Sequence, residues 1–136
     1  MQLDVYLQET ANNAAKQKII LEAAKQQLHF NKQLTPLEFS GVLHAIQVAI
    51  ENAIGKAKHL QRYHGKPVSV NAYDALQSLA DTGVIASTDL DAWRRIIGMR
   101  NRIVHDYMNL DTRIVMALLE TDGMDFVFDF LMADVR

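Results

Sequence analysis

The residues between Arg100 and Tyr107 combine side-chain types that suit chemistry on a phosphate ester. Arg100 carries a permanent positive charge on a planar fork of N–H donors, and this shape matches the oxygens of a phosphate group. His105 follows five residues later, and an imidazole with a pKa near ~6.5 can accept or donate a proton close to neutral pH. An Arg and a His at this spacing occur by chance in about one chain in four of this composition. Adding Tyr107, two residues further on, lowers that chance below roughly 1%.

The winding of the helix that carries these residues places them on different flanks. At about 100° per residue, Tyr107 lies within about 20° of Arg100, near the middle of an apolar arc, whereas His105 lies about 140° from Arg100. Asn101 is four residues before His105 and is placed to orient the imidazole. An unpaired buried guanidinium costs several kcal/mol. Either a carboxylate from another helix therefore pairs with Arg100, or this face meets a partner subunit and an anionic ligand.

Apolar periodicity predicts two long helices in the first half of the chain. The first is expected from about Leu3 to Phe30, with apolar residues at seven-residue steps. The second is expected from Thr35 to about Tyr63, because Thr35 supplies an N-cap hydroxyl and Glu38 closes a capping box. A break around the Gly-Lys-Pro segment at 65–67 follows.

The second half is expected to be helical as well. A short helix is predicted from about Asn71 to Thr82, and a second capping box at Thr88 and Asp91 opens the helix that carries the motif. A last long helix, kinked at Gly123, is predicted after Asn109. With only 6 Gly and 2 Pro, the sequence predicts an all-α fold. We expect an antiparallel bundle of four long helices plus a short extra helix, in a single domain over residues 1–136.

Composition excludes several classes of protein. The chain has 136 residues, 49% of them hydrophobic, so wholesale disorder is excluded. It has no Cys, which excludes a disulfide framework, a thiolate metal site and a cysteine nucleophile. No apolar run approaches the ~18 residues of a membrane span, so we expect a soluble cytoplasmic protein without a membrane. The net charge of −2 argues against non-specific coating of nucleic acid.

The motif resembles that of a known family. The run MRNRIVHDY at 99–107 is similar to the R-x4-H-x-Y signature of the HepT-like branch of the HEPN family. That branch comprises small all-helical ribonuclease toxins paired with minimal nucleotidyltransferase antitoxins. The likeness covers about Thr35 to Val115. It includes the Ala- and Ile-rich second helix, the Gly65-Lys66-Pro67 connection and the Asn-Leu-Asp segment at 109–111; the first and last helices match only in type.

The resemblance implies a HEPN-like fold and an endoribonuclease toxin of a type VII-like toxin–antitoxin system. It identifies Arg100 and His105 with the catalytic pair and Asn101 with the polar residue that commonly follows the Arg. It identifies Tyr107 with the tyrosine that the partner nucleotidyltransferase can AMPylate. The implied partners are RNA and that antitoxin, and no cofactor is expected.

The chemistry of RNA cleavage explains these residue types. RNA supplies its own nucleophile, the 2′-hydroxyl, so the protein must accept one proton, deliver another and stabilise a crowded phosphorane. No metal is required, and no metal-binding spacing of His and acidic residues is present. Because one chain supplies one matched His, we expect a homodimer that brings Arg100 and His105 of both subunits to a shared cleft.

Basic residues near the motif are candidates for RNA binding. One acid-free run contains Arg94, Arg95 and Arg102, and a second, near the end of the second helix, contains Lys58 and Arg62 with Lys56 and Lys66. Each run is alternatively an ordinary solvated helix face. Two functions compete with the nuclease. One is a non-catalytic substrate-binding or regulatory subunit of a nucleotidyltransferase complex; the other is a helical interaction domain in which Arg100 is structural.

Overall fold

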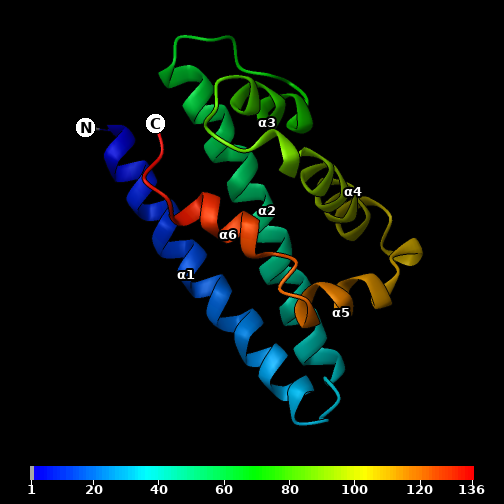
Figure 1. Cartoon of the computed structure of the whole chain (residues 1–136). Coiled ribbons are helices and arrows are strands. Elements are labelled where there is room, and N and C mark those ends of the chain that lie inside the picture. Colours follow the sequence, from blue (N-terminus) through cyan, green and yellow to red (C-terminus); the bar gives the residue numbers. More distant parts are fainter. Residues whose placement is uncertain (1) are drawn as a thin grey trace.

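The computed structural model describes residues 2–136, and the regular structure within them is helical, which confirms the all-α class. Two long helices, α1 (Gln2–His29) and α2 (Pro36–Tyr63), run side by side in opposite directions (Figure 1). Four shorter helices follow: α3 (Ala72–Asp81), α4 (Leu90–His105), α5 (Thr112–Glu120) and α6 (Asp125–Met132). No helix in the part of the chain that the structure describes is long and apolar enough to cross a membrane.

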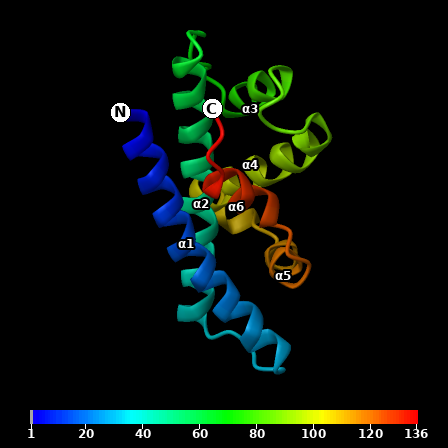
Figure 2. The same ribbon diagram turned by 60° about the vertical axis from the view of Figure 1, so that its left-hand side comes forward.

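Helix α2 is the centre of the fold, because it contacts α1, α3, α4 and α6. Figure 2 shows α6 lying against α1 and α2, with α3 and α4 on another side of α2. The buried face of α2 alternates small and branched side chains, so neighbouring helices can approach its backbone closely. The following members of this face are completely buried: Ala45, Ile46, Ala49, Ile50 and Ala53.

Several helix ends follow the sequence signals. The capping box of α2 is confirmed, since the Thr35 hydroxyl accepts the Glu38 N–H at 3.1 Å and the Glu38 carboxylate accepts the Thr35 N–H at 2.8 Å. Asn71 caps α3 by accepting the N–H of Tyr73 at 2.8 Å. The chain leaves α3 through Gly83, whose φ of +80° suits glycine. The predicted second and third helices are therefore confirmed.

The expected capping box at Thr88 and Asp91 is wrong. Residues Ser87–Asp89 form a 3-10 turn, so Thr88 lies inside a turn and its hydroxyl does not occupy the N-cap position. α4 begins at Leu90 after Asp89, and no side chain caps it. The preceding 3-10 turn already has near-helical backbone angles, with φ −88° and ψ −6° at Asp89. The backbone of the 3-10 turn thus leads directly into α4 without a side-chain cap.

The prediction of a single long C-terminal helix is also wrong. α5 ends at Glu120 and α6 begins at Asp125, with Asp122 between them at φ +55°. A Cβ at Gly123 would lie 2.5 Å from a methyl carbon of Leu118, so a larger residue here would displace the Leu118 side chain. Asp111, not Asn109, caps α5. Residues 2–136 therefore form two long helices, the intermediate α4 and three short helices, and the turn lets α6 pack on α1 and α2.

Lys56 has a structural role that its sequence context did not indicate. It was expected to belong to a basic surface run, but it is completely buried in α2. Its Nζ donates to the carbonyls of Phe130 and Ala133 at the end of α6, the latter at 2.7 Å, and lies 4.8 Å from the centre of the Phe130 ring. Lys56 thereby satisfies the carbonyls that a helix C-terminus leaves unpaired and fixes α6 to α2.

Replacing Lys56 by Met removes the donor and retains most of the side-chain volume. We expect the free energy of unfolding at pH 7 to fall by about 1–3 kcal/mol, because buried carbonyls lose their partner. Urea denaturation measures the change. Lys16→Met, which alters an exposed lysine on α1, is the control and is expected to change stability by less than about 0.5 kcal/mol.

The same variant tests the protonation of Lys56. Burial lowers the pKa of Lys56 to about 8, whereas the unfolded chain keeps the proton up to about 10.4. Between these values the unfolded state binds more protons, so the wild type gains stability over Lys56→Met as the pH rises through this window. A stability difference that stays constant from pH 8 to pH 10 contradicts this assignment.

Candidate functional site

The packing of α4 against α2 and α3 determines where its charged residues lie. Trp93, Ile96, Ile97 and Met99 of α4 are buried, and Trp93 meets the ring of Phe130 edge-on with centroids 5.6 Å apart. Burial of this stripe fixes the rotation of α4 about its own axis. Arg100, the next residue, therefore points from the edge of the buried stripe toward α2.

A carboxylate from another helix pairs with Arg100, which is the first of the two arrangements that the sequence left open. The Nε and Nη2 of Arg100 donate to one oxygen of Glu51 in α2, at 3.2 Å and 3.0 Å. The side chains of Arg100 and Glu51 keep 26% and 36% of their exposure, so the pair lies at the surface of the packed interface. Arg100 Nη1 donates to Asn101 Oδ1 at 2.9 Å. Asn101 therefore contacts Arg100 and makes no hydrogen bond to His105.

A groove of about 490 Å³ opens beside this pair, between α2, α3 and α4. Lys58, Arg94 and Arg100 line it together with Tyr73 and Asn101, and no Asp or Glu of residues 2–136 is among its lining residues. The guanidinium carbon of Arg94 lies 4.4 Å from the centre of the Tyr73 ring. Three cations line the groove and the one adjacent carboxylate, that of Glu51, pairs with Arg100, so the lining keeps an excess of positive charge that suits an anion.

The other basic residues expected to bind RNA do not line this groove. Arg95 borders a separate, mostly apolar groove between α4 and α5. Arg102 is exposed near the end of α4, and Arg62 is exposed near the end of α2. Of the five predicted RNA-binding residues, the structure brings Lys58 and Arg94 to Arg100 and leaves the other three outside the groove.

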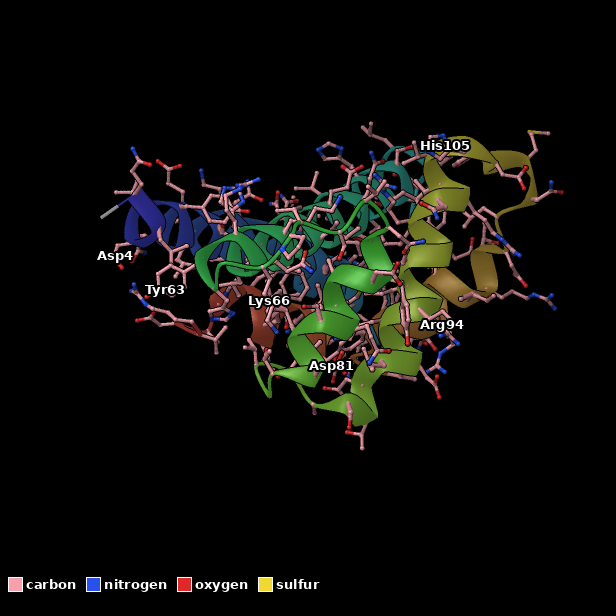
Figure 3. The ribbon with its side chains drawn as sticks, turned by 90° about the horizontal axis from the view of Figure 1, so that it is seen from above. Asp4, Tyr63, Lys66, Asp81, Arg94 and His105 are labelled. Atoms are coloured by element: carbon pink, nitrogen blue, oxygen red, sulfur yellow. The ribbon has the colours of Figure 1, made fainter. Side chains whose placement is uncertain are left out.

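His105 is the last residue of α4, is exposed and makes no side-chain hydrogen bond or ion pair with residues 2–136. α4 continues without a break from Arg100 to His105, so the two residues are about 7.5 Å apart along the axis and about 140° apart around it. Figure 3 shows His105 at the opposite end of α4 from Arg94. Arg100 and His105 therefore do not meet within one chain.

Tyr107 lies in a 3-10 turn (Tyr107–Asn109) directly after α4 and is 55% exposed. Its hydroxyl makes no hydrogen bond with residues 2–136. Tyr107 is thus open to a modifying enzyme. No group of three His, Asp or Glu side chains within residues 2–136 is arranged to hold a metal ion.

Sequence reasoning missed Glu51 and Tyr73. Glu51 carried a signal, because it is the lone acidic residue between Glu38 and Asp74 and lies at the flank of the apolar stripe of α2. A single acid there is the expected partner of a single cation on a facing helix. Tyr73 carried no comparable signal, because its contact with Arg94 depends on how α3 packs beside α4.

The sequence profile of the family described as ribonuclease HepT-like matches residues 13–132. A Shewanella oneidensis protein named mRNA nuclease HepT is 30% identical over 95 residues, which are 70% of this chain and 71% of that protein. A candidate RNase of Archaeoglobus fulgidus is 29% identical over 63% of this chain. The chain spans 64% of the length of the archaeal relative.

Solved structures share the fold. The tri-AMPylated Shewanella oneidensis HEPN toxin in complex with MNT antitoxin matches with a TM-score of 0.73 and 24% identity, over 92% of this chain and 97% of that chain. A toxin–antitoxin with AMP-PNP matches with a TM-score of 0.71 and 22% identity, over 90% of this chain and 96% of that chain. At these identities the similarity shows the fold, and the helical arrangement of this chain is that of these toxins.

Proposed function

This chain belongs to the ribonuclease HepT-like family, and on that basis we propose that it is a metal-independent endoribonuclease, the toxin of a type VII-like toxin–antitoxin pair. The placement of Arg100 supports the proposal. Its permanently charged guanidinium lines a groove whose lining lacks carboxylates, on the same helix as His105. A guanidinium so placed can bind a phosphate of RNA.

In the proposed reaction the 2′-hydroxyl of RNA attacks the adjacent phosphorus, a bond from O2′ to phosphorus forms, and the bond from phosphorus to O5′ breaks. One His105 imidazole accepts the proton of the 2′-hydroxyl, and a protonated one donates to the leaving 5′-oxygen. A 2′,3′-cyclic phosphate and a 5′-hydroxyl result. Glu51 and Asn101 accept three hydrogen bonds from Arg100, so two of its five N–H groups remain for phosphorane oxygens.

Two proton transfers require two imidazoles, and one chain supplies a single His105 on a flank away from Arg100. We therefore propose a two-fold dimer whose cleft receives Arg100 and His105 from both protomers. Exposed apolar side chains surround the end of α4: Val104 is 40% exposed, Ile114 52% and Met108 92%. A second copy that covers this surface buries these side chains and brings the two imidazoles together.

The proposed regulator is a minimal nucleotidyltransferase antitoxin that AMPylates Tyr107. The Shewanella toxin of the same fold is described as tri-AMPylated and in complex with MNT antitoxin. Here Tyr107 is exposed, so its hydroxyl is open to an incoming nucleotide. Attached AMP places a negatively charged phosphodiester beside His105, where it repels RNA and competes for the donors that bind substrate phosphate.

One observation favours the alternative of a non-catalytic regulatory subunit. Glu51 already occupies two donors of Arg100, and His105 lies elsewhere in the single chain. Such a subunit binds the nucleotidyltransferase stably and leaves RNA intact. The cleavage experiment separates the two functions.

We expect the purified protein to cleave single-stranded RNA in the presence of EDTA. Arg100→Ala and His105→Ala are each expected to lower the rate by at least about 100-fold, because they remove charge stabilisation and proton transfer. Gel analysis of labelled RNA measures the rate, and Lys16→Ala on the distant α1 is the control. Wild-type protein that is folded and leaves RNA uncut in every buffer contradicts the nuclease and supports the regulatory subunit.

The shared cleft makes a quantitative prediction for mixed dimers. When wild type and His105→Ala are co-expressed in equal amounts, about one quarter of the dimers contain two imidazoles. The cleavage rate per protomer is then expected to fall to about a quarter of the wild-type value. A fall to about one half means that each protomer works alone. Analytical ultracentrifugation that finds a fully active monomer leads to the same conclusion.

Incubation with ATP and the cognate nucleotidyltransferase is expected to raise the mass of the protein by one or more AMP units and to suppress cleavage. Mass spectrometry of the intact protein and its peptides locates the modification. Tyr107→Phe removes the acceptor hydroxyl, and Tyr63→Phe, at another exposed tyrosine, is the matched control. Equal AMP incorporation in wild type and Tyr107→Phe excludes Tyr107 as the acceptor.

A further inference from the structure

The groove between α2, α3 and α4 contains an aromatic ring and open space in addition to cations that can bind a phosphate. Its volume of about 490 Å³ falls within the usual range of small-molecule sites, roughly 300–1,000 Å³. One wall carries a layered pair in which the guanidinium of Arg94 covers the ring of Tyr73 at 4.4 Å. Arg94 is itself exposed and lines the groove, so a ligand in the groove can reach its side chain.

Such a planar pair suits a nucleobase. Bases that leave a duplex stack on aromatic rings and on arginine guanidinium planes, and each stacked base contributes about 1–3 kcal/mol to binding. Tyr73 is half-buried, and its hydroxyl donates to Gln77 at 3.4 Å, so the ring is held in place beneath Arg94. The platform is therefore formed before any ligand arrives.

The remaining groove residues match the other parts of a nucleotide. Lys58 on α2 extends across the groove, with its Nζ 3.4 Å from the carbonyl of Val70 in the segment before α3. Its ammonium can meet a backbone phosphate there. Arg94 and Arg100 are about 9 Å apart along α4, so a base on Arg94 and a phosphate at Arg100 can belong to the same strand.

Gly98 lines the groove without presenting a side chain to it. It lines the groove inside α4, where glycine costs about 1 kcal/mol relative to alanine. A Cβ built on Gly98 meets no atom within 4 Å, so packing does not demand a glycine at this position. A larger side chain here projects into the space that a base would occupy.

We propose that this groove is a subsite for one unpaired nucleotide that flanks the phosphate held by Arg100, with its base stacked on the Arg94–Tyr73 pair and its phosphate on Lys58. The position next to the cleaved bond rests on the proposed ribonuclease function, whereas binding of the base does not. The subsite selects single-stranded RNA, because a paired base cannot reach the platform without leaving its stack.

Equilibrium binding separates the subsite from catalysis. The probe is a short, fluorescently labelled 2′-O-methyl oligoribonucleotide, which lacks the attacking hydroxyl and stays intact, and fluorescence anisotropy measures its Kd. Tyr73→Leu, Arg94→Lys and Gly98→Leu are each expected to raise the Kd at least about fivefold, the effect of losing one stacked base. Arg94→Lys keeps the charge and removes the planar group, so it distinguishes stacking from electrostatic attraction.

Matched controls come from the same chain. Gly41→Leu alters another helical glycine with no atom within 4 Å of its Cβ, outside the groove, and Arg95→Lys alters the neighbouring arginine, which does not line it. Both are expected to bind the probe as the wild type does. Gly98→Leu is expected to fold, because its new side chain meets open space and leucine favours the helix; thermal unfolding checks each variant.

Abasic probes supply the decisive comparison. Oligonucleotides that lack a single base, at each position in turn, are expected to show one position whose loss weakens wild-type binding about as much as Tyr73→Leu does. At that position Tyr73→Leu and Gly98→Leu should cause no further loss. Unchanged binding by Gly98→Leu and Tyr73→Leu, or equal losses with every abasic probe, overturns the subsite. If the protein cuts no RNA but its binding still depends on that base, the subsite is supported and the proposed nuclease function is contradicted.

Discussion

Arginine keeps its charge inside a folded protein, so a helix with an arginine beside its apolar stripe packs only where that charge is satisfied. In this chain Glu51 is the partner of that charge, because its carboxylate accepts two hydrogen bonds from Arg100. Glu51 is carried by α2, whose neighbouring Ile50 and Ala53 are completely buried, so its position is rigid. The buried apolar stripe sets the rotation of α4, and the pair with Glu51 holds Arg100 at the wall of the groove. Residues further along α4, including His105, point outward as a result.

Lys56 is a second cation with partners inside the protein, and its role is purely structural. Lys56 is completely buried and donates to the carbonyls that end α6, so its donors are directed into the protein. Arg100 keeps a quarter of its side-chain exposure and spare N–H groups at the groove. The difference is one of access, because both charges have partners and, of the two, only Arg100 also faces the groove. A charged side chain that has hydrogen-bond partners inside the protein can therefore be either closed to ligands, as Lys56 is, or open to the groove, as Arg100 is.

Local signals predicted the start of α2 correctly and the start of α4 wrongly. The hydroxyl of Thr35 and the carboxylate of Glu38 act within one turn, so their capping box was readable from the sequence and is confirmed. The break between α5 and α6 was not readable, because apolar residues on both sides of it keep a helical spacing. The break lets α6 pack on α1 and α2, and that packing is a tertiary contact that the local sequence does not encode.

The sequence by itself determined the helical class, the residues able to do phosphate chemistry, and the angle of about 140° between Arg100 and His105, because helical geometry acts over neighbouring residues. Only the tertiary structure decided which cations line the groove. It buried Lys56, gathered Lys58 and Arg94 beside Arg100, and placed the ring of Tyr73 under a guanidinium. These outcomes depend on contacts between helices that are distant in the chain, and no local spacing encodes which faces will meet.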